Sequence, residues 1–198
     1  MNSSPTSPIR SVAVFCGSRF GNDPAYREAA EALGTGIAAA GWQLVYGGGR
    51  VGLMGVVADA VLAGGGSVFG VIPDFLQRRE VAHGGAVDLV RTETMHERKT
   101  LMFDAADAFV TMPGGLGTFD ETIEITTWRQ LGLHDKAIII CDVLGWAQPY
   151  LAALNGAIHQ GFADPSSARL YEVLPDVSSV LAHLSALSRP NVGSPERV

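Results

Sequence analysis

The stretch DAFVTMPGGLGTFDE, residues 107–121, joins an apolar run to a glycine-rich turn and to the first residues of a helical segment. The run at 107–112 is apolar on both faces, which is typical of a strand buried in a parallel sheet. After Pro113, three glycines within four residues let the backbone approach a ligand closely and adopt positive φ. Thr118 is expected to begin a helix, whose free N–H groups attract an anion. The stretch therefore predicts a strand, a loop and a helix that together hold a phosphate.

The same alternation of apolar runs and helical segments extends along the 198 residues. It predicts an α/β protein with an open parallel sheet of about seven strands and helices on both faces. The expected strands are 11–16, 42–46, 67–72, 86–90, 107–112, 136–141 and 170–174, and the expected helices are 24–40, 51–63, 94–106, 118–131, 146–160 and 176–187. One domain is expected at 10–187, and the Ser- and Pro-rich ends, 1–9 and 188–198, are expected to be mobile tails.

The composition limits the partners. A formal net charge of −6 argues against a nucleic-acid partner, because binding to a phosphate backbone relies on clustered Lys and Arg. The 14 basic residues still leave room for a pocket that binds one small phosphate. The N-terminal MNSSPTSPIR lacks the apolar core of a signal peptide, and no apolar run approaches the roughly 18 residues of a membrane span. We therefore expect a cytoplasmic protein without membrane contact.

Neither the cysteines nor the histidines form a recognisable reactive set. Cys16 and Cys141 each close an apolar run and are expected to be buried thiols, rather than a disulfide or nucleophiles. No CxxC motif or histidine cluster indicates a metal, so neither a metal nor another cofactor is expected. The five histidines are scattered along the chain, which argues against a Ser-His-Asp set.

Glycine turns follow three of the expected strands, as CGS at 16–18, GGGRVGLMG at 47–55 and PGGLGT at 113–118. Ligands of an open parallel sheet bind outside the carboxyl ends of the strands, so these turns are expected to line one cleft. The second turn matches G-x-G-x-x-G, with Asp74 at the end of the next strand. It lies on the second strand–helix unit, and Pro73 precedes the acid, so a phosphate- or packing-related turn is favoured over an NAD or FAD site.

Asp120 and Glu121 follow the glycine turn directly. Their structural interpretation is a capping box, T-x-x-E, between Thr118 and Glu121. A functional interpretation gains support from TMHERKTLM at 94–102, where Arg98 shares a helical stripe with Met95 and lies on the inward side. A buried arginine needs an acceptor, which is a structural carboxylate, an active-site acid or a phosphate. Lys99, about 100° further round the helix, either reaches a second phosphate oxygen or is solvated.

A phosphate cradle, an inward arginine and a carboxylate together suit cleavage of a nucleotide at its sugar–base bond. Loss of the base builds positive charge on the ribose, and a nearby carboxylate stabilises this oxocarbenium-like state and orients the attacking water. This chemistry requires no metal.

With these residues in view, the chain closely resembles the LONELY GUY family of cytokinin riboside 5′-monophosphate phosphoribohydrolases, some of which have been labelled lysine decarboxylases. The resemblance covers roughly residues 10–187 and includes VFCGS, LVYGGGRVGLMG, GVIP, RRE, MHERK, PGGLGT with DE, and TWRQLGLHDK in collinear order. It implies a Rossmann-like fold and a homodimer with the active site near the interface. It also implies hydrolysis of N6-substituted adenosine monophosphates, and often of AMP, to the free base and ribose 5-phosphate.

The resemblance also implies roles for particular residues. The catalytic pair falls on Arg98 and Glu121, and Glu80 and Thr127 enter the site through the resemblance alone. The candidate substrate-binding residues are Gly17, Ser18, Gly47, Gly48, Glu80, Met95, Arg98, Lys99, Gly114, Gly115, Leu116, Gly117, Thr118, Asp120 and Thr127. Many plant members carry Tyr and Glu where this chain has Leu116 and Asp120, which bears on the preferred base.

There are three alternatives to this function. A nucleotide- or cofactor-binding carrier of the same fold would bind without cleaving, but the presence of both Arg98 and Glu121 favours an enzyme. A general nucleoside-monophosphate nucleosidase would differ only in its base pocket. Lysine decarboxylation is disfavoured, because it needs a pyridoxal cofactor on a lysine and neither Lys99 nor Lys136 has a suitable setting.

Overall fold

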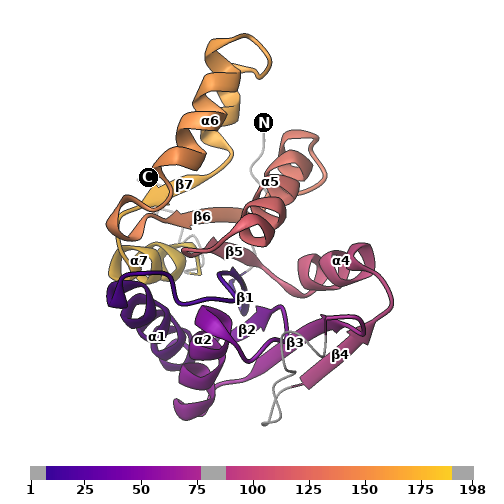
Figure 1. Ribbon diagram of the computed structural model, residues 1–198, viewed down its shortest axis with the longest axis vertical. Coiled ribbons are helices and arrows are strands. Elements are labelled where there is room, and N and C mark those ends of the chain that lie inside the picture. The colour runs from indigo at the N-terminus through magenta and orange to yellow at the C-terminus, as the bar shows by residue number, and fades with distance from the viewer. Residues whose placement is uncertain (1–7, 77–87, 189–198) are drawn as a thin grey trace, which may run out of the picture.

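The computed structural model describes residues 8–76 and 88–188, in which parallel strands alternate with helices (Figure 1). The strands are β1 (Ser11–Phe15), β2 (Gln43–Tyr46), β3 (Val68–Pro73), β4 (Asp88–Thr92), β5 (Ala108–Thr111), β6 (Ala137–Cys141) and β7 (Glu172–Leu174). The α-helices are α1 (Pro24–Ala39), α2 (Gly52–Ala63), α4 (Met95–Ala105), α5 (Leu116–Gln130), α6 (Gln148–His159) and α7 (Val177–Leu187). Two short 3₁₀ helices, η1 (Val143–Gly145) and η2 (Pro165–Arg169), lie in the C-terminal third. The predicted α/β architecture with a seven-stranded parallel sheet is confirmed.

The strand order fixes where a ligand can bind. The order across the sheet is β4-β3-β2-β1-β5-β6-β7, and every neighbouring pair is parallel. The chain builds the sheet outward from β1 to β4 and then returns to the other side of β1, where Phe15 pairs with Thr111. The order therefore reverses between β1 and β5. Because ligands bind at such a reversal outside the carboxyl ends of the strands, the loops after Phe15 and Thr111 are placed to form a site.

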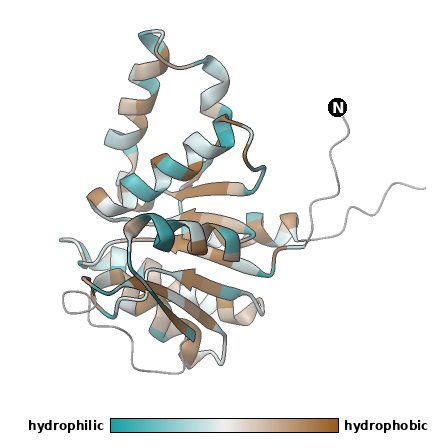
Figure 2. Cartoon of the chain, turned by 90° about the vertical axis from the view of Figure 1, so that its right-hand side faces the viewer, coloured by the Kyte–Doolittle hydropathy of each residue, from teal (hydrophilic) through white to brown (hydrophobic). Residues whose placement is uncertain are grey.

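Helices cover both faces of the sheet and bury side chains that alternate along the strands. On one face, α1, α2 and α7 pack over strand residues such as Val14, with Leu33 of α1 in the same cluster. On the other face, Phe15 packs with Met102 of α4 and Ile125 of α5. Figure 2 shows the brown, apolar strands enclosed between helices whose hydrophilic residues are teal. The apolar runs of the sequence are thus the buried strands, as expected.

Most predicted boundaries agree with the structure to within two residues. The fourth strand begins at Asp88 and ends at Thr92, two residues later than expected. Ile9, in the segment expected to lie outside the fold, is buried in the core. The helix expected at 118–131 begins at Leu116, two residues early. This last difference changes the interpretation of the site.

Candidate functional site

The glycine loop, residues 113–117, leads from β5 into α5 without a side-chain cap. Gly115 is the N-cap residue, with φ −108° and ψ −151°, and no side chain accepts a hydrogen bond from the first turn. In α1, α4 and α7, by contrast, the side chains of Asp23, Thr94 and Asp176 accept from the first-turn amides. The first N–H groups of a helix have no partner within it, so the start of α5 presents donors to an external anion.

The predicted capping box of Thr118 and Glu121 is wrong. Thr118 is the third residue of α5 and is buried, rather than being the residue that precedes the helix. The helix begins earlier, with Gly115 in the extended conformation of an N-cap residue. A T-x-x-E cap does occur in α4, where Thr94 Oγ1 accepts from the N–H of Glu97 at 3.1 Å. Another interaction has to orient Glu121.

The loop after β1 packs closely against the glycine loop. The N–H of Gly17 donates to the carbonyl of Pro113 at 3.0 Å. A Cβ on Gly114 would lie 2.1 Å from Thr118 Oγ1 and 2.9 Å from the Gly17 nitrogen. This approach of two backbones leaves no space for a side chain, so glycine is required at position 114.

The G-x-G-x-x-G match forms a packing turn, which is one of the two alternatives that the sequence favoured over a dinucleotide site. Gly52 has φ +64°, and a Cβ there would lie 2.2 Å from the backbone carbon of Ser18. The amides of Leu53 and Met54, in the first turn of α2, donate to the Gly17 carbonyl at 2.9 and 3.3 Å. The first amides of α2 thus hold the β1–α1 loop. Because they already donate to Gly17, they are not available to bind the pyrophosphate of a dinucleotide.

Arg98 and Glu121 form a shielded ion pair. Arg98 Nη2 lies 3.5 Å from Glu121 Oε1, and the side chains are 6% and 12% exposed. The expectation that Arg98 faces inward is confirmed. Its Nε is buried and has no hydrogen-bond partner among the described residues. A buried arginine with a free donor can bind a further acceptor besides its carboxylate partner.

Gly47, after β2, makes room for this arginine. A Cβ at position 47 would lie 2.1 Å from Arg98 Nη2 and 3.2 Å from its Cζ. The guanidinium therefore lies directly against the backbone of the β2–α2 loop. Gly47 belongs to the site by shaping the space for Arg98.

Lys99 and Asp120 form a second pair next to the first. Lys99 Nζ lies 2.8 Å from Asp120 Oδ2 and 3.1 Å from Glu124 Oε2. Partial burial opposes the charge of the ammonium, but the hydrogen bonds to both acids outweigh it and raise the pKa of Lys99. Lys99 is therefore neither free in solvent nor unpartnered, and it remains charged at neutral pH.

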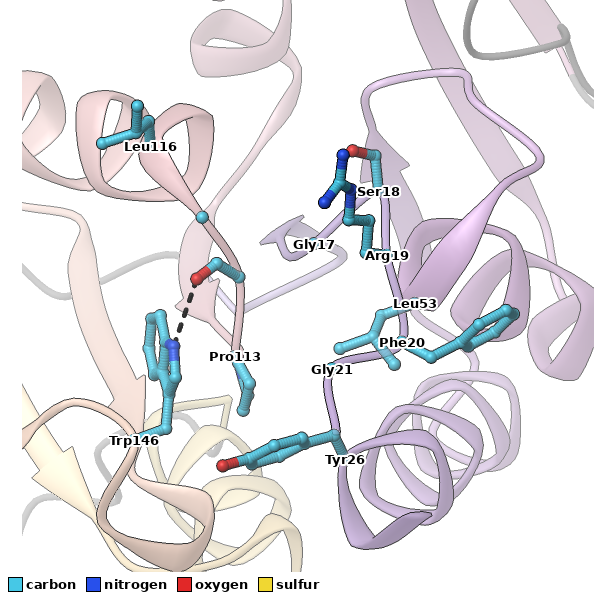
Figure 3. Close-up of a pocket in the computed structure, with 12 residues that line it drawn as sticks. Gly17, Ser18, Arg19, Phe20, Gly21, Tyr26, Leu53, Pro113, Leu116 and Trp146 are labelled. Carbon is cyan, nitrogen blue, oxygen red and sulfur yellow. Dashed lines mark hydrogen bonds between the residues drawn. The ribbon is translucent and has the colours of Figure 1, made fainter. Parts of the chain in front are cut away.

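A cavity of about 240 Å³ brings Arg98, Asp120 and Glu121 together, whereas Lys99 lines a separate, much smaller pocket with Glu124 and Trp128. The lining of the 240 Å³ cavity includes the predicted residues Gly17, Ser18, Met95, Arg98, Gly115, Leu116, Gly117, Thr118, Asp120 and Glu121. A larger cavity of about 500 Å³ adjoins it across Gly17, Ser18, Gly115 and Leu116. Figure 3 shows this larger cavity between the β1–α1 loop and the glycine loop, with Tyr26 and Trp146 on its lower side. Both cavities lie where the strand order reverses.

Some predicted residues lie elsewhere. Gly48 has φ +74° and packs against Ile72 and Leu89, away from the cavity. Thr127 lies on the exposed face of α5, further along the helix than the ion pair, and its hydroxyl donates to the Ile123 carbonyl. Glu80 lies outside the described residues.

The structure also adds residues that were not among the predicted site residues. Cys16, Met54 and Leu76 line the smaller cavity, and Trp146 lines the larger one. Trp146 follows β6, whose carboxyl end lies at the same sheet edge as that of β5. The three glycine turns were found because ligands bind outside the carboxyl ends of parallel strands. The same reasoning, applied to aromatic residues that follow a strand, would have found Trp146.

The thiol at the cavity floor is not poised for nucleophilic attack. Burial, together with the negative charge of Glu121, raises the pKa of Cys16 well above its ordinary value. Only a thiolate is an effective nucleophile. Cys16 therefore lines the site as a neutral apolar group.

Neither a metal-binding cluster nor a membrane-spanning helix is found among the described residues. Within 8–76 and 88–188, no group of three His, Cys, Asp or Glu is arranged to hold a metal ion. No helix within the same ranges is long and apolar enough to cross a membrane.

Comparisons with known proteins identify the family. The family model described as possible lysine decarboxylase matches residues 54–184. The chain is 44% identical over 178 residues to a probable cytokinin riboside 5′-monophosphate phosphoribohydrolase of Oryza sativa subsp. japonica, covering 90% of this chain and 78% of the relative. A cytokinin riboside 5′-monophosphate phosphoribohydrolase of Rhodococcoides fascians is 41% identical over 174 residues, covering 87% and 88%. One from Arabidopsis thaliana is 38% identical over 178 residues, covering 90% and 84%.

Solved structures show the same fold at lower identity. The molybdenum cofactor binding protein from Rippkaea orientalis superposes with a TM-score of 0.67 at 20% identity, covering 92% of this chain and 98% of that one. The Moco carrier protein from Chlamydomonas reinhardtii gives 0.67 at 21% identity, covering 91% and 97%. At these identities the likeness concerns the architecture alone.

The description of the family model does not fit the lysines of this chain. A pyridoxal cofactor requires a lysine that can become a neutral amine and form a Schiff base. Lys99 is held by two acids that raise its pKa. Lys136 precedes β6, at the opposite edge of the sheet from the cavity, and its Nζ donates to the Phe103 carbonyl at 2.7 Å. The curated relatives and the matched motifs instead place the chain in the LONELY GUY family of cytokinin riboside 5′-monophosphate phosphoribohydrolases.

Proposed function

We propose that the protein hydrolyses the N-glycosidic bond of cytokinin riboside 5′-monophosphates, which are N6-substituted forms of AMP, and that AMP itself is also a substrate. The products are the free base and ribose 5-phosphate. The observation that supports this most directly is the shielded pair of Arg98 and Glu121 at 3.5 Å, beside an uncapped helix start. An anion site and a fixed carboxylate within one cavity are what cleavage at the sugar of a nucleotide requires.

The start of α5 is the proposed site of the 5′-phosphate. Its first-turn amides are free of side-chain caps, and the glycines at 114, 115 and 117 allow close approach. With the phosphate bound there, the ribose extends along α5 toward Glu121, one and a half turns further on. Asp120, held by Lys99, points into the same cavity and is proposed to contact the substrate.

Glu121 and Arg98 are the proposed catalytic pair. As the bond between C1′ and the base breaks, positive charge develops on the ribose and the Glu121 carboxylate stabilises it. The same carboxylate orients the water whose oxygen bonds to C1′ and accepts the proton that this water loses, while the electron pair of the broken bond leaves with the base, which takes up a proton from solvent. Arg98 holds the carboxylate in place and keeps one buried donor, Nε, for the substrate.

Leu116 is the proposed contact for the base or its N6 substituent. Its side chain is 88% exposed, and the residue lines both cavities. An apolar side chain in this position favours an apolar substituent on the ligand.

A homodimer is proposed as well, with a second copy packed on α5. Leu116, Asp120, Ile123, Thr127 and Leu131 follow one another at intervals of three or four residues, so they lie along one exposed stripe. The stripe starts at the cavity and ends at the C-cap of α5. A second copy on it would cover Ile123 and Leu131, which are 46% and 68% exposed, and would bring Thr127 into an enclosed site.

The test is incubation of the purified protein with isopentenyladenosine 5′-monophosphate and, separately, with AMP. Free base and ribose 5-phosphate are followed by chromatography, and we expect both from either nucleotide. If the protein is instead a carrier of the same fold, the opposite result is expected. It would bind the nucleotide and release no base, whether Glu121 is present or replaced by Ala.

A further inference from the structure

Trp146 reaches the glycine loop from a different part of the chain. Its Nε1–H donates to the carbonyl of Gly114 at 3.1 Å, as the dashed line in Figure 3 shows. Gly114 precedes α5, whereas Trp146 follows η1 at the carboxyl end of β6. This is a side-chain hydrogen bond to the backbone of the loop to which we assigned the 5′-phosphate.

The bond fixes one particular peptide unit. In a planar trans peptide, the carbonyl of Gly114 and the N–H of Gly115 point in opposite directions. With the carbonyl held toward Trp146, the Gly115 N–H is directed to the other side of the loop. A peptide between two glycines has little steric preference and turns over easily, so its orientation needs an external partner. Trp146 supplies that partner.

The indole is itself held in place by aromatic stacking. Its ring lies 5.2 Å from that of Phe119 at an interplanar angle of 12°, and Phe119 stacks on Tyr150 at 5.0 Å and 1°. Phe119 belongs to α5, the helix that follows the glycine loop. Trp146 therefore contacts both the loop carbonyl and the helix whose amides face the anion. Such stacked pairs stabilise the arrangement beyond the burial of their area.

The turn that presents the indole is strained. Leu144 has φ +54° and ψ +24°, which a residue with a branched side chain rarely adopts, although its own side chain is 65% exposed. Asp142 stabilises the turn, because its Oδ1 accepts from the Ala147 N–H at 2.7 Å. Backbone strain of this kind persists where the surrounding structure fixes a functional geometry.

We infer that Trp146 is a positioning residue for the 5′-phosphate, acting through the Gly114–Gly115 peptide to keep the Gly115 N–H turned toward the anion. This inference rests on the proposed function for the identity of the ligand. It assigns no contact between the indole and the substrate. Its effect is on affinity for the phosphate group and not on the cleavage step.

The test is Trp146→Phe, which keeps an aromatic ring to stack on Phe119 and removes the N–H together with part of the indole ring. We expect KM for isopentenyladenosine 5′-monophosphate to rise about threefold to tenfold, as for loss of one hydrogen bond, with kcat within about twofold. The dissociation constant of ribose 5-phosphate, measured by calorimetry, should rise by the same factor, and that of free adenine should stay constant. Trp42→Phe, the same change in a buried tryptophan just before β2, serves as the control and should leave both constants unaltered.

An unchanged affinity of Trp146→Phe for ribose 5-phosphate would overturn the inference, as would an equal loss of affinity for ribose 5-phosphate and adenine. The calorimetric measurement needs no turnover. If the wild type binds ribose 5-phosphate but releases no base, the proposed hydrolysis fails while the role of Trp146 is still decided by the two affinities.

Discussion

Arg98 and Glu121, which come from different helices on the same face of the sheet, meet at 3.5 Å in a pocket where each side chain is almost fully shielded from water. An ion pair in such surroundings does not exist mainly for stability, because the cost of desolvating both charges offsets much of their attraction. It does hold a carboxylate in one position, beside a positive charge. A carboxylate fixed in position is what stabilisation of a positively charged transition state requires.

Glu121→Gln should abolish most of the turnover. The amide has the same shape but no negative charge, so kcat for isopentenyladenosine 5′-monophosphate should fall about 10²- to 10³-fold. The dissociation constant of the nucleotide should change by less than about threefold, because the phosphate contacts remain. The control is Glu31→Gln on the exposed side of α1, which should behave as wild type. Turnover within threefold of wild type would exclude the role assigned to Glu121.

Gly47→Ala should disable the site although it replaces no ionisable side chain. The added Cβ would lie 2.1 Å from Arg98 Nη2, so the guanidinium must leave Glu121. We expect kcat/KM to fall at least about tenfold and the free energy of unfolding to decrease by about 1–3 kcal/mol, as for overpacking elsewhere.

The control for this substitution is Gly156→Ala in α6, where a Cβ meets nothing within 4 Å. That change should raise the free energy of unfolding by about 0.5–1 kcal/mol and leave activity unaltered. Urea denaturation and steady-state kinetics measure both effects. Full activity of Gly47→Ala would show that the position of Arg98 is not critical.

Leu116→Ala should distinguish the two nucleotides. The leucine is highly exposed at the boundary of the cavities, so removing it costs little stability. If it contacts the N6 substituent, KM for isopentenyladenosine 5′-monophosphate rises about fivefold, equal to about 1 kcal/mol of lost apolar contact, while KM for AMP changes less than twofold. Equal effects on both substrates would place the substituent elsewhere.

Ile123→Glu should separate the proposed homodimer into monomers. A charge in the middle of the stripe on α5 cannot be buried without a partner, so light scattering after size-exclusion chromatography should give the mass of one chain instead of two. Activity should fall together with the dimer fraction. Val173→Glu, on the edge strand β7, provides an exposed apolar position outside the stripe and should leave the mass unchanged. A monomeric wild type with full activity would rule out the composite site.

The two thiols should resist alkylation at moderately alkaline pH. Burial raises the pKa of Cys141 from 9.0 to about 12, with smaller effects of Asp176 and Asp142, and raises that of Cys16 further. At pH 8 the folded protein therefore holds a smaller fraction of thiolate than an unfolded chain does. Iodoacetamide should label neither cysteine within an hour, as measured by mass spectrometry. In guanidinium chloride both should react. The same shift means that the stability contributed by the protonated thiols is present below pH 9 and is lost as the pH rises toward 12.

Much of the site followed from local patterns. The inward position of Arg98 was predicted from its stripe with Met95, because helical period alone fixes which side of α4 faces the sheet. The succession of a strand, a glycine loop and a helix was predicted from the apolar run, the glycines and the helical segment that follow one another. The start of α5 was not, because the sequence offered Thr118 as a conventional cap and gave no sign that Gly115 would serve instead.

The sequence by itself determined the parallel sheet, the two helical layers and the nature of the groups at its carboxyl edge, since each depends on periodicity and residue type over short stretches. Only the tertiary structure decided which of these groups meet. Arg98 lies against Gly47 and pairs with Glu121, and Trp146 bonds to Gly114, across 51, 23 and 32 positions of the chain respectively. Such distances are set by how the strands are ordered and how the helices pack on them, and no local pattern encodes a contact between residues so far apart in sequence.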